Sequence, residues 1–465
     1  MSLRTSLRVL VAGVLAGACV GHAALAQTPQ DADLVRRGAY LARAADCVAC
    51  HTAKGGQPYA GGYPVSTPFG TIYVPNITPD RATGIGGWSD DQFVRAVRQG
   101  VGAHGENLYP AMPYNSYAKM SRPDVLAIKA FLFSLAPVQR PKLHNALLFP
   151  LNVRPVLSMW KLFNPRPADL QDDPARSVEW NRGRYLVEAA GHCGECHSPR
   201  TLTEGENTKR YLGGGSLGAW TAFNITSDPR AGIGAWSQDE IVQFLATGHN
   251  AHAGASGPMA EAVENSTRFL TPADLKAMAV YLKTVPPIGG SSGPVRAEVG
   301  APADPAVEIR GGPVRASGAE LYLGNCATCH GADGAGRGTG FGAYPALFHR
   351  SAVGARDPHN LVSVILGGVQ RTTNAGQLAM PAFADQLDDQ QAAVLANYVR
   401  TTFGAGKGGV TPSMVASLRR GPSIVGLQIL EIMAAVAALA VVLAVGGWIA
   451  VGRGRKAVRP GRRPA

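Results

Sequence analysis

The amino-acid sequence predicts an all-α protein with three consecutive helical domains and one C-terminal transmembrane helix. Three observations lead to this prediction. The pentapeptide Cys-x-x-Cys-His occurs three times, one segment of the chain is repeated, and a run near the C-terminus carries no charged side chain. Helix start signals are frequent, whereas strand signals are weak throughout.

Each pentapeptide is typical of a c-type haem attachment site, in which two thiols bond to the porphyrin and the histidine binds the iron. The three copies are Cys47, Cys50 and His51; Cys193, Cys196 and His197; and Cys326, Cys329 and His330. A structural zinc site requires four ligands, and a redox dithiol is expected in a βαβ pattern. The sequence shows neither pattern, and only Cys19 lies outside the motifs. It therefore predicts three covalently bound haem c groups.

The sixth iron ligand decides whether a haem transfers electrons or transforms a small molecule. A methionine follows each motif at a similar distance: Met112, Met259 and Met380. A single methionine is more often core filler, and Met120 and Met278 lie in or beside predicted helices, where packing explains them. The recurrence of a loop methionine in all three repeats predicts His/Met ligation, which raises the reduction potential.

Four other histidines are rival ligands, but they do not recur at one equivalent position in the repeats: His104, His249, His252 and His359. A ligating histidine usually donates its second ring proton to a backbone carbonyl. Pro345 is placed to accept that proton from His330. For the other two domains the sequence does not select an acceptor.

An internal repeat organises the middle of the chain. Residues Asn76 to Gly100 recur as Asn224 to Gly248, and the pattern Arg-Gly-x-Tyr-Leu at Arg37 recurs at Arg182. A shorter third unit opens at Gly318.

Each unit is expected to run from a short helix into its haem motif, then through Gly- and Pro-rich loops into two further helices. We expect those later helices at Asp90–Gln99, Arg122–Ser134, Gln238–Thr247, Pro272–Lys283, Asn360–Leu366 and Asp388–Thr401. Side chains suited to N-caps precede or begin five of them: Ser89, Ser121, Ser237, Thr271 and Asp388.

The two ends of the chain predict a membrane-anchored, exported protein. Residues 1–26 have the basic start, apolar stretch and small-residue site of a secretory signal peptide. Residues 432–451 are apolar and long enough to cross a bilayer as a helix, with a helix in the membrane plane as the alternative. The basic tail, 452–465, predicts a cytoplasmic C-terminus and periplasmic haem domains in the bacterial inner membrane.

These signals divide the chain into eight expected segments. They are a signal peptide (1–26), cytochrome c domain 1 (27–140), an apolar linker (141–174), cytochrome c domain 2 (175–286), a Pro/Gly linker (287–313), cytochrome c domain 3 (314–405), the transmembrane anchor (424–451) and the tail (452–465). The Pro/Gly linker has the composition of a surface connector. The segment 143–166 is expected to pack between haem domains or to present an apolar surface to a partner.

The formal net charge of +12 does not indicate nucleic-acid binding. Most of the excess lies in the signal peptide and the tail, where membrane topology requires it. No dinucleotide-binding fingerprint, Ser-His-Asp arrangement or molybdenum site is visible. We therefore expect no substrate site and no enzyme activity in this chain itself.

With these residues in place, the chain resembles the three-haem cytochrome c subunits of membrane-bound periplasmic dehydrogenases of acetic-acid and related bacteria. That family serves alcohol, gluconate, sorbitol, fructose and aldehyde dehydrogenase complexes. The resemblance covers nearly the whole mature chain, including Arg37–Leu41, the loop Tyr109–Tyr114, Asn224–Thr226 and the order of the three motifs. It implies covalent haem c at all three sites with Met112, Met259 and Met380 as axial ligands.

The resemblance also implies a role in electron transfer. Electrons would leave a separate catalytic subunit bearing a quinone, flavin or molybdenum cofactor and would reduce ubiquinone in the membrane. Two alternatives stay open: a haem enzyme with one open iron acting on a small inorganic substrate, and a tethered cytochrome that delivers electrons to a terminal oxidase. Some family members attach through amphipathic C-terminal helices, from which the single apolar run of this chain departs.

Overall fold

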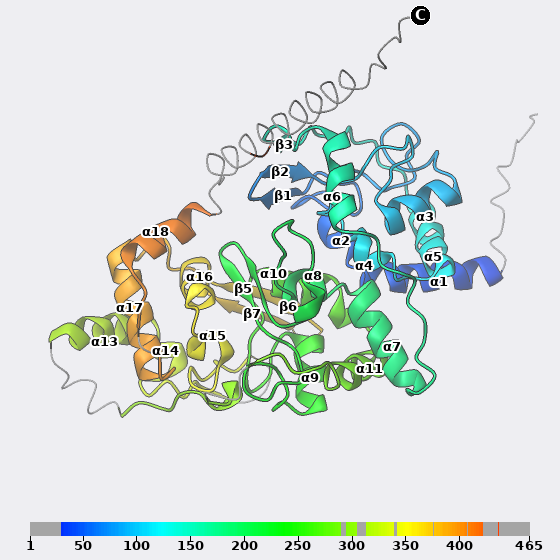
Figure 1. Cartoon of the computed structure of the whole chain (residues 1–465). Coiled ribbons are helices and arrows are strands. Elements are labelled where there is room, and N and C mark those ends of the chain that lie inside the picture. Colours follow the sequence, from blue (N-terminus) through cyan, green and yellow to red (C-terminus); the bar gives the residue numbers. More distant parts are fainter. Residues whose placement is uncertain are drawn as a thin grey trace, which may run out of the picture.

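The computed structural model describes residues 29–289, 294–304, 313–338, 342–374, 376–406, 408–421 and 436. Three mostly helical units follow one another, and domain 2 lies between the other two (Figure 1). The predicted signal peptide, the apolar run 432–451 and the basic tail lie outside the described residues. Within the described residues, no helix is long and apolar enough to cross a membrane.

Domain 1 is built from helices around one haem motif. Its elements are α1 (Pro29–Ala44), α2 (Cys47–Cys50), β1 (Pro64–Thr67), β2 (Gly70–Tyr73), α3 (Asp90–Gln99), α4 (Tyr114–Tyr117) and α5 (Arg122–Phe133). The linker that follows carries β3 (Ala146–Leu147), η1 (Arg154–Val156) and α6 (Leu157–Phe163).

Domain 2 repeats this plan with five α-helices and adds three short η elements. Its elements are α7 (Val178–Tyr185), η2 (Leu186–Ala190), α8 (Gly194–His197), η3 (Thr208–Arg210), β4 (Gly215–Leu217), β5 (Trp220–Ala222), α9 (Gln238–Thr247), α10 (Pro258–Asn265), η4 (Thr267–Phe269) and α11 (Pro272–Leu282). The remaining elements are η5 (Arg296–Glu298), α13 (Pro313–Asn325), α14 (Ala327–His330), α15 (Ser351–Gly354), α16 (His359–Gly367), β6 (Val369–Thr373), β7 (Gly376–Met380), α17 (Asp389–Thr402) and α18 (Pro412–Arg420).

The expected later helices are confirmed, with ends that differ from the predicted ones by at most one residue. All five predicted N-caps accept a hydrogen bond from a backbone N–H in the first turn. At Ser89, Ser237 and Asp388 the side chain three residues later reaches back to complete a capping box. Local side-chain chemistry therefore sets where these helices begin.

The prediction of an all-α fold needs correction, because the described residues also form seven short strands. They make the antiparallel sheet β1-β2-β3 and the hairpins β4-β5 and β6-β7. The strands are only two to five residues long. An alternating pattern cannot stand out in segments this short, so the sequence signal was weak.

In each domain the helix before the haem motif crosses the last long helix at a glycine. A Cβ on Gly38 would lie 1.8 Å from the carbonyl oxygen of Ala127 in α5, and one on Gly183 would lie 1.9 Å from that of Ala277 in α11. In domain 3, a Cβ on Gly318 would lie 2.7 Å from the Cβ of Tyr398 in α17, which is a side-chain contact rather than a backbone one. Only glycine allows the backbones to approach this closely, so the crossing fixes where each motif begins.

Domain 2 contains one extra residue between its crossing and its motif. Cys47 follows Tyr40 by seven positions, whereas Cys193 follows Tyr185 by eight. The segment Leu186–Ala190 forms a π-helical turn, which absorbs one residue relative to an α-helix. Because of this turn, the second motif follows its crossing helix in the same position as the first motif does, despite the extra residue.

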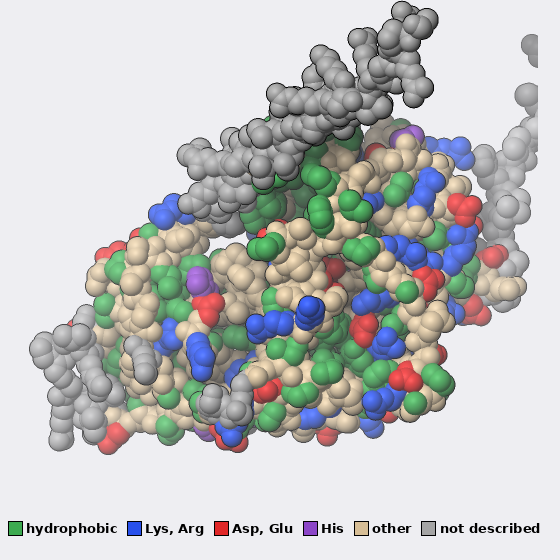
Figure 2. Space-filling view, in the orientation of Figure 1, with side chains coloured by type: hydrophobic (Ala, Val, Ile, Leu, Met, Phe, Trp, Pro, Cys, Tyr) green, Lys and Arg blue, Asp and Glu red, His purple; other side chains and the backbone are tan. Residues whose placement is uncertain are grey.

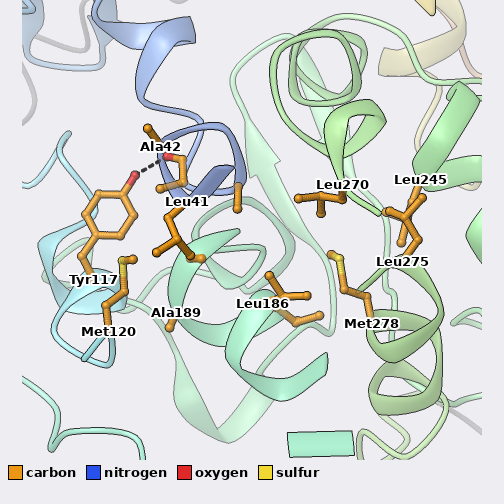
Figure 3. Close-up of a cluster of buried hydrophobic side chains, with 14 of the residues drawn as sticks. Leu41, Ala42, Tyr117, Met120, Leu186, Ala189, Leu245, Leu270, Leu275 and Met278 are labelled. Atoms are coloured by element: carbon orange, nitrogen blue, oxygen red, sulfur yellow. Dashed lines mark hydrogen bonds between the residues drawn. The ribbon is translucent and has the colours of Figure 1, made fainter. Parts of the chain in front are cut away.

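Domains 1 and 2 share one hydrophobic core rather than having one each. Figure 3 shows Leu41 and Met120 from domain 1 lying beside Leu186 and Met278 from domain 2. Domain 3 has a separate core formed by α13, α16, α17 and α18. The first two predicted domains therefore form one packed body.

The polar part of the interface between domains 1 and 2 is reciprocal. On α5, Asp124 accepts hydrogen bonds from Arg37 of its own domain at 2.5 Å and from the Tyr185 hydroxyl of domain 2 at 2.6 Å. Burial, the charge of Asp124 and this hydrogen bond raise the pKa of Tyr185, so the phenol stays protonated and donates.

On the other side, Asp274 at the start of α11 accepts from Arg182 of its own domain at 2.7 Å and from Tyr40 of domain 1 at 2.5 Å. Burial acts to raise the pKa of Asp274, but the hydrogen bonds from Arg182 and Tyr40 outweigh it and lower the pKa. The tyrosine of each Arg-Gly-x-Tyr-Leu pattern thus donates to an aspartate of the other domain. This reciprocity is expected when two repeats are related by a pseudo-two-fold axis.

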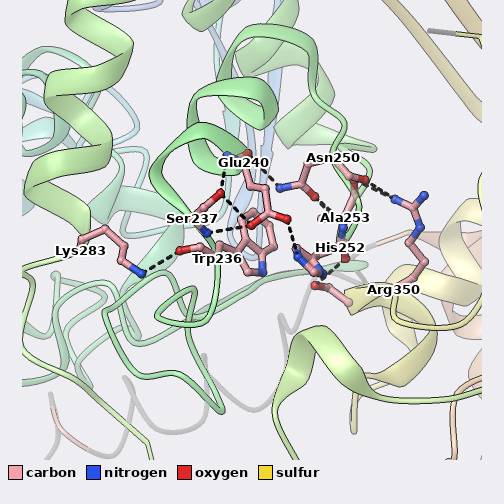
Figure 4. Close-up of polar contacts among 9 residues, drawn as sticks. Trp236, Ser237, Glu240, Asn250, His252, Ala253, Lys283 and Arg350 are labelled. Carbon is pink, nitrogen blue, oxygen red and sulfur yellow. Dashed lines mark hydrogen bonds and ion pairs between the residues drawn. The ribbon is translucent and has the colours of Figure 1, made fainter. Parts of the chain in front are cut away.

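Domain 3 joins domain 2 mainly through polar contacts. The backbone N–H of Thr221 in β5 donates to the Asn360 amide at 2.7 Å, and that amide donates back to the Thr221 carbonyl at 2.8 Å. Arg350 donates to the carbonyl oxygen of Asn250 at 2.6 Å (Figure 4). These contacts hold the third unit against the second.

The Pro/Gly linker is not a free surface connector over its described part. Arg296 is half-buried against domain 2, where it donates to the carbonyl oxygens of Asn224 at 3.0 Å and Ala231 at 2.9 Å. Val295 and Ala297 contact the shared core. This stretch therefore runs along the surface but is anchored to domain 2 by these three residues.

The linker between domains 1 and 2 combines the two expected outcomes. Leu157 is buried, and Trp160 packs edge-on against Tyr114 of domain 1. Other apolar side chains of the segment, including Phe149 and Leu162, face solvent. It packs on domain 1 and also exposes an apolar surface.

The glycine crossing yields a stability prediction. We expect Gly183→Ala to destabilise the holoprotein by about 1–3 kcal/mol, because the new methyl group overlaps the Ala277 carbonyl. Gly324→Ala is the matched control, since a Cβ on this helical glycine meets nothing within 4 Å. Thermal unfolding should show a lower Tm for the first variant and an unchanged or higher Tm for the second. An equal Tm for both would contradict the close crossing.

The reciprocal tyrosines yield a second prediction. The double variant Tyr40→Phe, Tyr185→Phe loses two hydrogen bonds to carboxylates, each worth about 1.5–3 kcal/mol. Limited proteolysis between domains 1 and 2 should therefore become faster. Tyr344→Phe serves as the control, because that side chain is half-exposed and its hydroxyl has no hydrogen bond with the described residues. Equal cleavage rates for the two variants would show that the tyrosines do not hold the domains together.

Candidate haem-binding sites

Each Cys-x-x-Cys-His motif forms a single helical turn after the crossing helix. The first motif begins α2 at Cys47 and ends with His51 as the C-cap, and the others form α8 and α14 in the same position. Asp46 and His192, which directly precede the first two motifs, have positive φ angles of 51° and 38°. This left-handed residue turns the chain sharply from the crossing helix into the motif.

Every motif histidine is held by the same backbone contact. Nδ1 lies 2.8 Å from the carbonyl oxygen of Pro75 in His51, 2.6 Å from that of Phe223 in His197 and 2.8 Å from that of Pro345 in His330. The prediction for Pro345 is confirmed. Donation from Nδ1–H fixes the tautomer and leaves Nε2 as the free ligand atom.

The two acceptors that the sequence did not reveal occupy equivalent positions in the repeat. Pro75 directly precedes Asn76, and Phe223 directly precedes Asn224, where the repeated segments begin. Each asparagine caps its own loop by accepting from the backbone N–H two residues later at 2.8 Å. The repeat thus builds the loop that presents the carbonyl oxygen to the histidine.

The surroundings of these histidines favour the neutral imidazole that binds iron. Burial lowers the pKa of His51 to about 4, and the hydrogen bond to Pro75 opposes this only in part. Burial likewise lowers the pKa of His197, helped by the positive charge of Arg296, and burial lowers the pKa of His330. All three rings are therefore neutral at physiological pH.

The motif cysteines do not have the properties of reactive redox thiols. Burial, with smaller contributions from neighbouring charges, raises the pKa of Cys47 and Cys193 to about 12 and that of Cys326 to about 11. Reactive redox thiols have lowered pKa values instead. In the described part of the chain, no cluster of three or more His, Cys, Asp or Glu side chains could hold a metal ion.

Buried polar groups near the first two motifs have no partner among the described residues. They include the hydroxyls of Tyr59 and Tyr211. The electrostatic influence of Cys47 on Tyr59, and of Cys193 on Tyr211, shows that these rings lie close to the motifs. Unpaired buried polar groups are rare in folded proteins, so their presence fits sites made to receive a further group.

The structure places the three candidate methionines in different elements, which corrects the expectation that all lie in loops. Met112 lies in the turn before α4, Met259 in the first turn of α10, and Met380 at the end of strand β7. All three are partly buried and pack against hydrophobic clusters. In contrast, Met120 and Met278 are 0 % and 1 % exposed, as expected for core filler.

Three of the rival histidines are held in other contacts. The Nε2 atom of His252 lies 2.9 Å from the Glu240 carboxylate, and the ring stacks on Trp236 (Figure 4). His359 contacts the carboxylate of Asp357, and His249 lies 3.3 Å from the guanidinium of Arg350. Each of these three rings therefore has a partner within the protein itself.

The first two haem motifs each contact the neighbouring domain. Glu195, within the second motif, accepts a hydrogen bond at 2.9 Å from Ser116 in α4, the helix that follows Met112. Conversely, α10, which begins beside Met259, packs against α2 of the first motif and against β6 of domain 3. Each motif of the pair therefore contacts the methionine-bearing segment of the other domain, and domain 2 contacts both neighbours.

Comparisons with known proteins agree with this geometry. Residues 35–136 match the family described as "Cytochrome c", and residues 313–399 match the family described as "Cytochrome C oxidase, cbb3-type, subunit III". The chain is 40% identical to the fructose dehydrogenase cytochrome subunit of Gluconobacter japonicus, covering 88% of this chain and 87% of the relative.

Two further relatives have similar names. The chain is 41% identical to the gluconate 2-dehydrogenase cytochrome c subunit of Pantoea cypripedii, over 90% of this chain and 96% of the relative. It is 40% identical to the cytochrome c subunit of the quinone alcohol dehydrogenase of Gluconacetobacter polyoxogenes, over 85% and 86%. The chain belongs to this family of dehydrogenase cytochrome c subunits, and it is an electron-transfer subunit.

Proposed function

We propose that this chain carries three covalent haem c groups and passes electrons from a separate catalytic dehydrogenase subunit to ubiquinone in the bacterial inner membrane. The names of the relatives favour a catalytic partner, because each describes the cytochrome subunit of a larger dehydrogenase. When bound, each haem supplies a one-electron iron couple. The rest of the proposal concerns what the residues of this chain do.

The motif residues would hold the three groups. Covalent attachment is assigned to Cys47, Cys50, Cys193, Cys196, Cys326 and Cys329, and axial ligation to His51, Met112, His197, Met259, His330 and Met380. The observation that supports the assignment most is the contact of each histidine Nδ1 with a backbone carbonyl, which leaves Nε2 available as the ligand atom in all three domains. With a methionine on the other side, each iron would be closed to substrates.

The arrangement of the domains supports transfer within the chain. Domains 1 and 2 share a core, and α10 of domain 2 contacts both the first motif and a strand of domain 3. A packed body of this kind holds its sites at fixed separations. We therefore propose that electrons pass between the outer sites by way of domain 2.

The membrane location is also part of the proposal. The signal peptide, the apolar run 432–451 and the basic tail support a periplasmic chain anchored at its C-terminus, with inner-membrane lipid as a partner. Ubiquinone as acceptor distinguishes this role from a tethered cytochrome that serves a terminal oxidase. Ubiquinone reduction by the purified complex tests that distinction directly.

The haem content gives the first prediction for this site. Intact mass spectrometry of the mature protein should show three covalent haem additions. The variant Cys326→Ser, Cys329→Ser should show two, because only the third attachment is lost. The variant Met278→Leu should keep all three and controls for disturbed folding. A wild-type mass with fewer than three additions would contradict the assignment.

The axial methionines give the second prediction. We expect Met112→Leu to lower the reduction potential of one haem by roughly 100–200 mV, within the range of about 0.8 V that axial ligands control. The same variant should bind carbon monoxide at that haem, because one iron position becomes open. Met120→Leu, a buried methionine in the same domain, should change neither property. Carbon monoxide binding by the wild-type protein would instead favour a haem enzyme with an open iron.

A further inference from the structure

The linker between domains 1 and 2 presents an apolar surface that the electron-transfer role does not use. We call the exposed side chains of Phe149, Met159, Leu162 and Phe163 the apolar platform; they are 58–76 % exposed. Three of them follow the i, i+3, i+4 spacing along α6 and therefore share one face of the helix. In Figure 2, hydrophobic side chains gather at the upper centre, where Figure 1 places α6.

The other face of α6 is firmly attached to the protein, so this exposure is not the result of a loose segment. Leu157 is buried, and the indole N–H of Trp160 donates to the Thr203 carbonyl at 2.7 Å. Lys161 donates to the carbonyl oxygens of Gln99 at 3.0 Å and Gly100 at 2.8 Å, which end α3. The fold therefore holds the apolar face outward.

A cationic pocket lies in the same linker. Its volume is about 370 Å³, and its lining includes Lys142, His144, Arg154 and Tyr109. Arg154 is fixed by donation to the Asn107 carbonyl at 2.5 Å and lies 4.9 Å from the centre of the Tyr109 ring. The side chains of Lys142 and His144 have no hydrogen bond or ion pair with any described residue.

The positive charges of this pocket are only partly balanced by the chain. Burial and the nearby charge of Arg154 lower the pKa of Lys142, and Glu106 opposes this only in part. Neither Lys142 nor Arg154 forms an ion pair with a described carboxylate. Residues 125–168 contain no Asp or Glu, whereas 140–166 contain five Lys and Arg. Two neighbouring cations whose charge Glu106 balances only in part are stabilised when a further anion joins them.

We propose that this linker is a membrane-docking surface, in which the apolar platform enters the lipid interface and the cationic pocket binds the phosphate of an anionic phospholipid. An exposed Phe, Leu and Met face flanked by Lys and Arg is the pattern of a segment that lies in the membrane interface. The positive charges of Lys142 and Arg154 beside the apolar platform suit the anionic phosphate of a lipid headgroup. The chain also continues past α18 into the apolar run 432–451.

This inference rests on the proposed membrane location and adds a second contact to it. The linker is hydrogen-bonded to the loop that contains Asn107 and Tyr109. Arg154 donates to the Asn107 carbonyl, and the Tyr109 hydroxyl donates to the Leu151 carbonyl at 2.9 Å. Tyr109 stands three residues before Met112. Docking would therefore hold the first haem site beside the bilayer surface, within reach of an electron acceptor dissolved in the membrane.

The test is hydrogen exchange of the full-length holoprotein in detergent and in two kinds of nanodisc, one of phosphatidylcholine alone and one also containing phosphatidylglycerol. We expect the amides of residues 142–163 to exchange about tenfold more slowly in the nanodiscs than in detergent. The protection should be greater with phosphatidylglycerol. Lys142→Gln should reduce that lipid preference about fivefold, the factor that corresponds to about 1 kcal/mol per cation near an anionic surface. Lys54→Gln, an exposed lysine outside the linker, should leave it unchanged.

The double variant Leu162→Ser, Phe163→Ser should lose the protection in both kinds of disc while keeping all three haems. Unchanged exchange of residues 142–163 in a protein that has entered the discs would overturn this inference alone. Failure to enter the discs would overturn the membrane anchor as well. Protection that appears only when the catalytic subunit is added would show that the surface binds a protein instead.

Discussion

The contact between each motif histidine and a backbone carbonyl is the constraint on which the sites depend. A histidine that donates from Nδ1 presents its other ring nitrogen in one direction only. The three acceptors come from loops that begin at Pro75, Phe223 and Pro345, and two of these loops are the repeated part of the sequence. The glycine crossings place the motifs, and the loops then aim their histidines.

The second feature of the molecule is that the first two repeats pack around one common core. Domains 1 and 2 exchange tyrosine hydrogen bonds to each other's aspartates, and their apolar side chains form one core. Domain 3 keeps its own core and docks through backbone and amide contacts. A rigid pair with a third unit attached keeps the distances between sites constant, which a relay of electrons requires.

Local signals predicted the helices well, because an N-cap such as Ser89 or Asp388 acts within its own first turn. The motif residues were likewise visible from spacing alone. The acceptor Phe223 was missed, although the repeat aligns it with Pro75. The pairs Tyr40–Asp274 and Tyr185–Asp124 join residues 234 and 61 positions apart, and no local pattern encodes such contacts. Short hairpins, and the different elements that carry Met259 and Met380, were hidden for the same reason: tertiary packing decides them.

The central claim is that all three irons would be closed by a histidine and a methionine. It is tested most directly by quantifying the weak long-wavelength absorption band of methionine-ligated ferric haem in the oxidised, full-length wild-type protein. The account predicts an intensity that corresponds to three such haems per chain and no high-spin signal in electron paramagnetic resonance. An intensity for two haems accompanied by a high-spin signal for the third would contradict it.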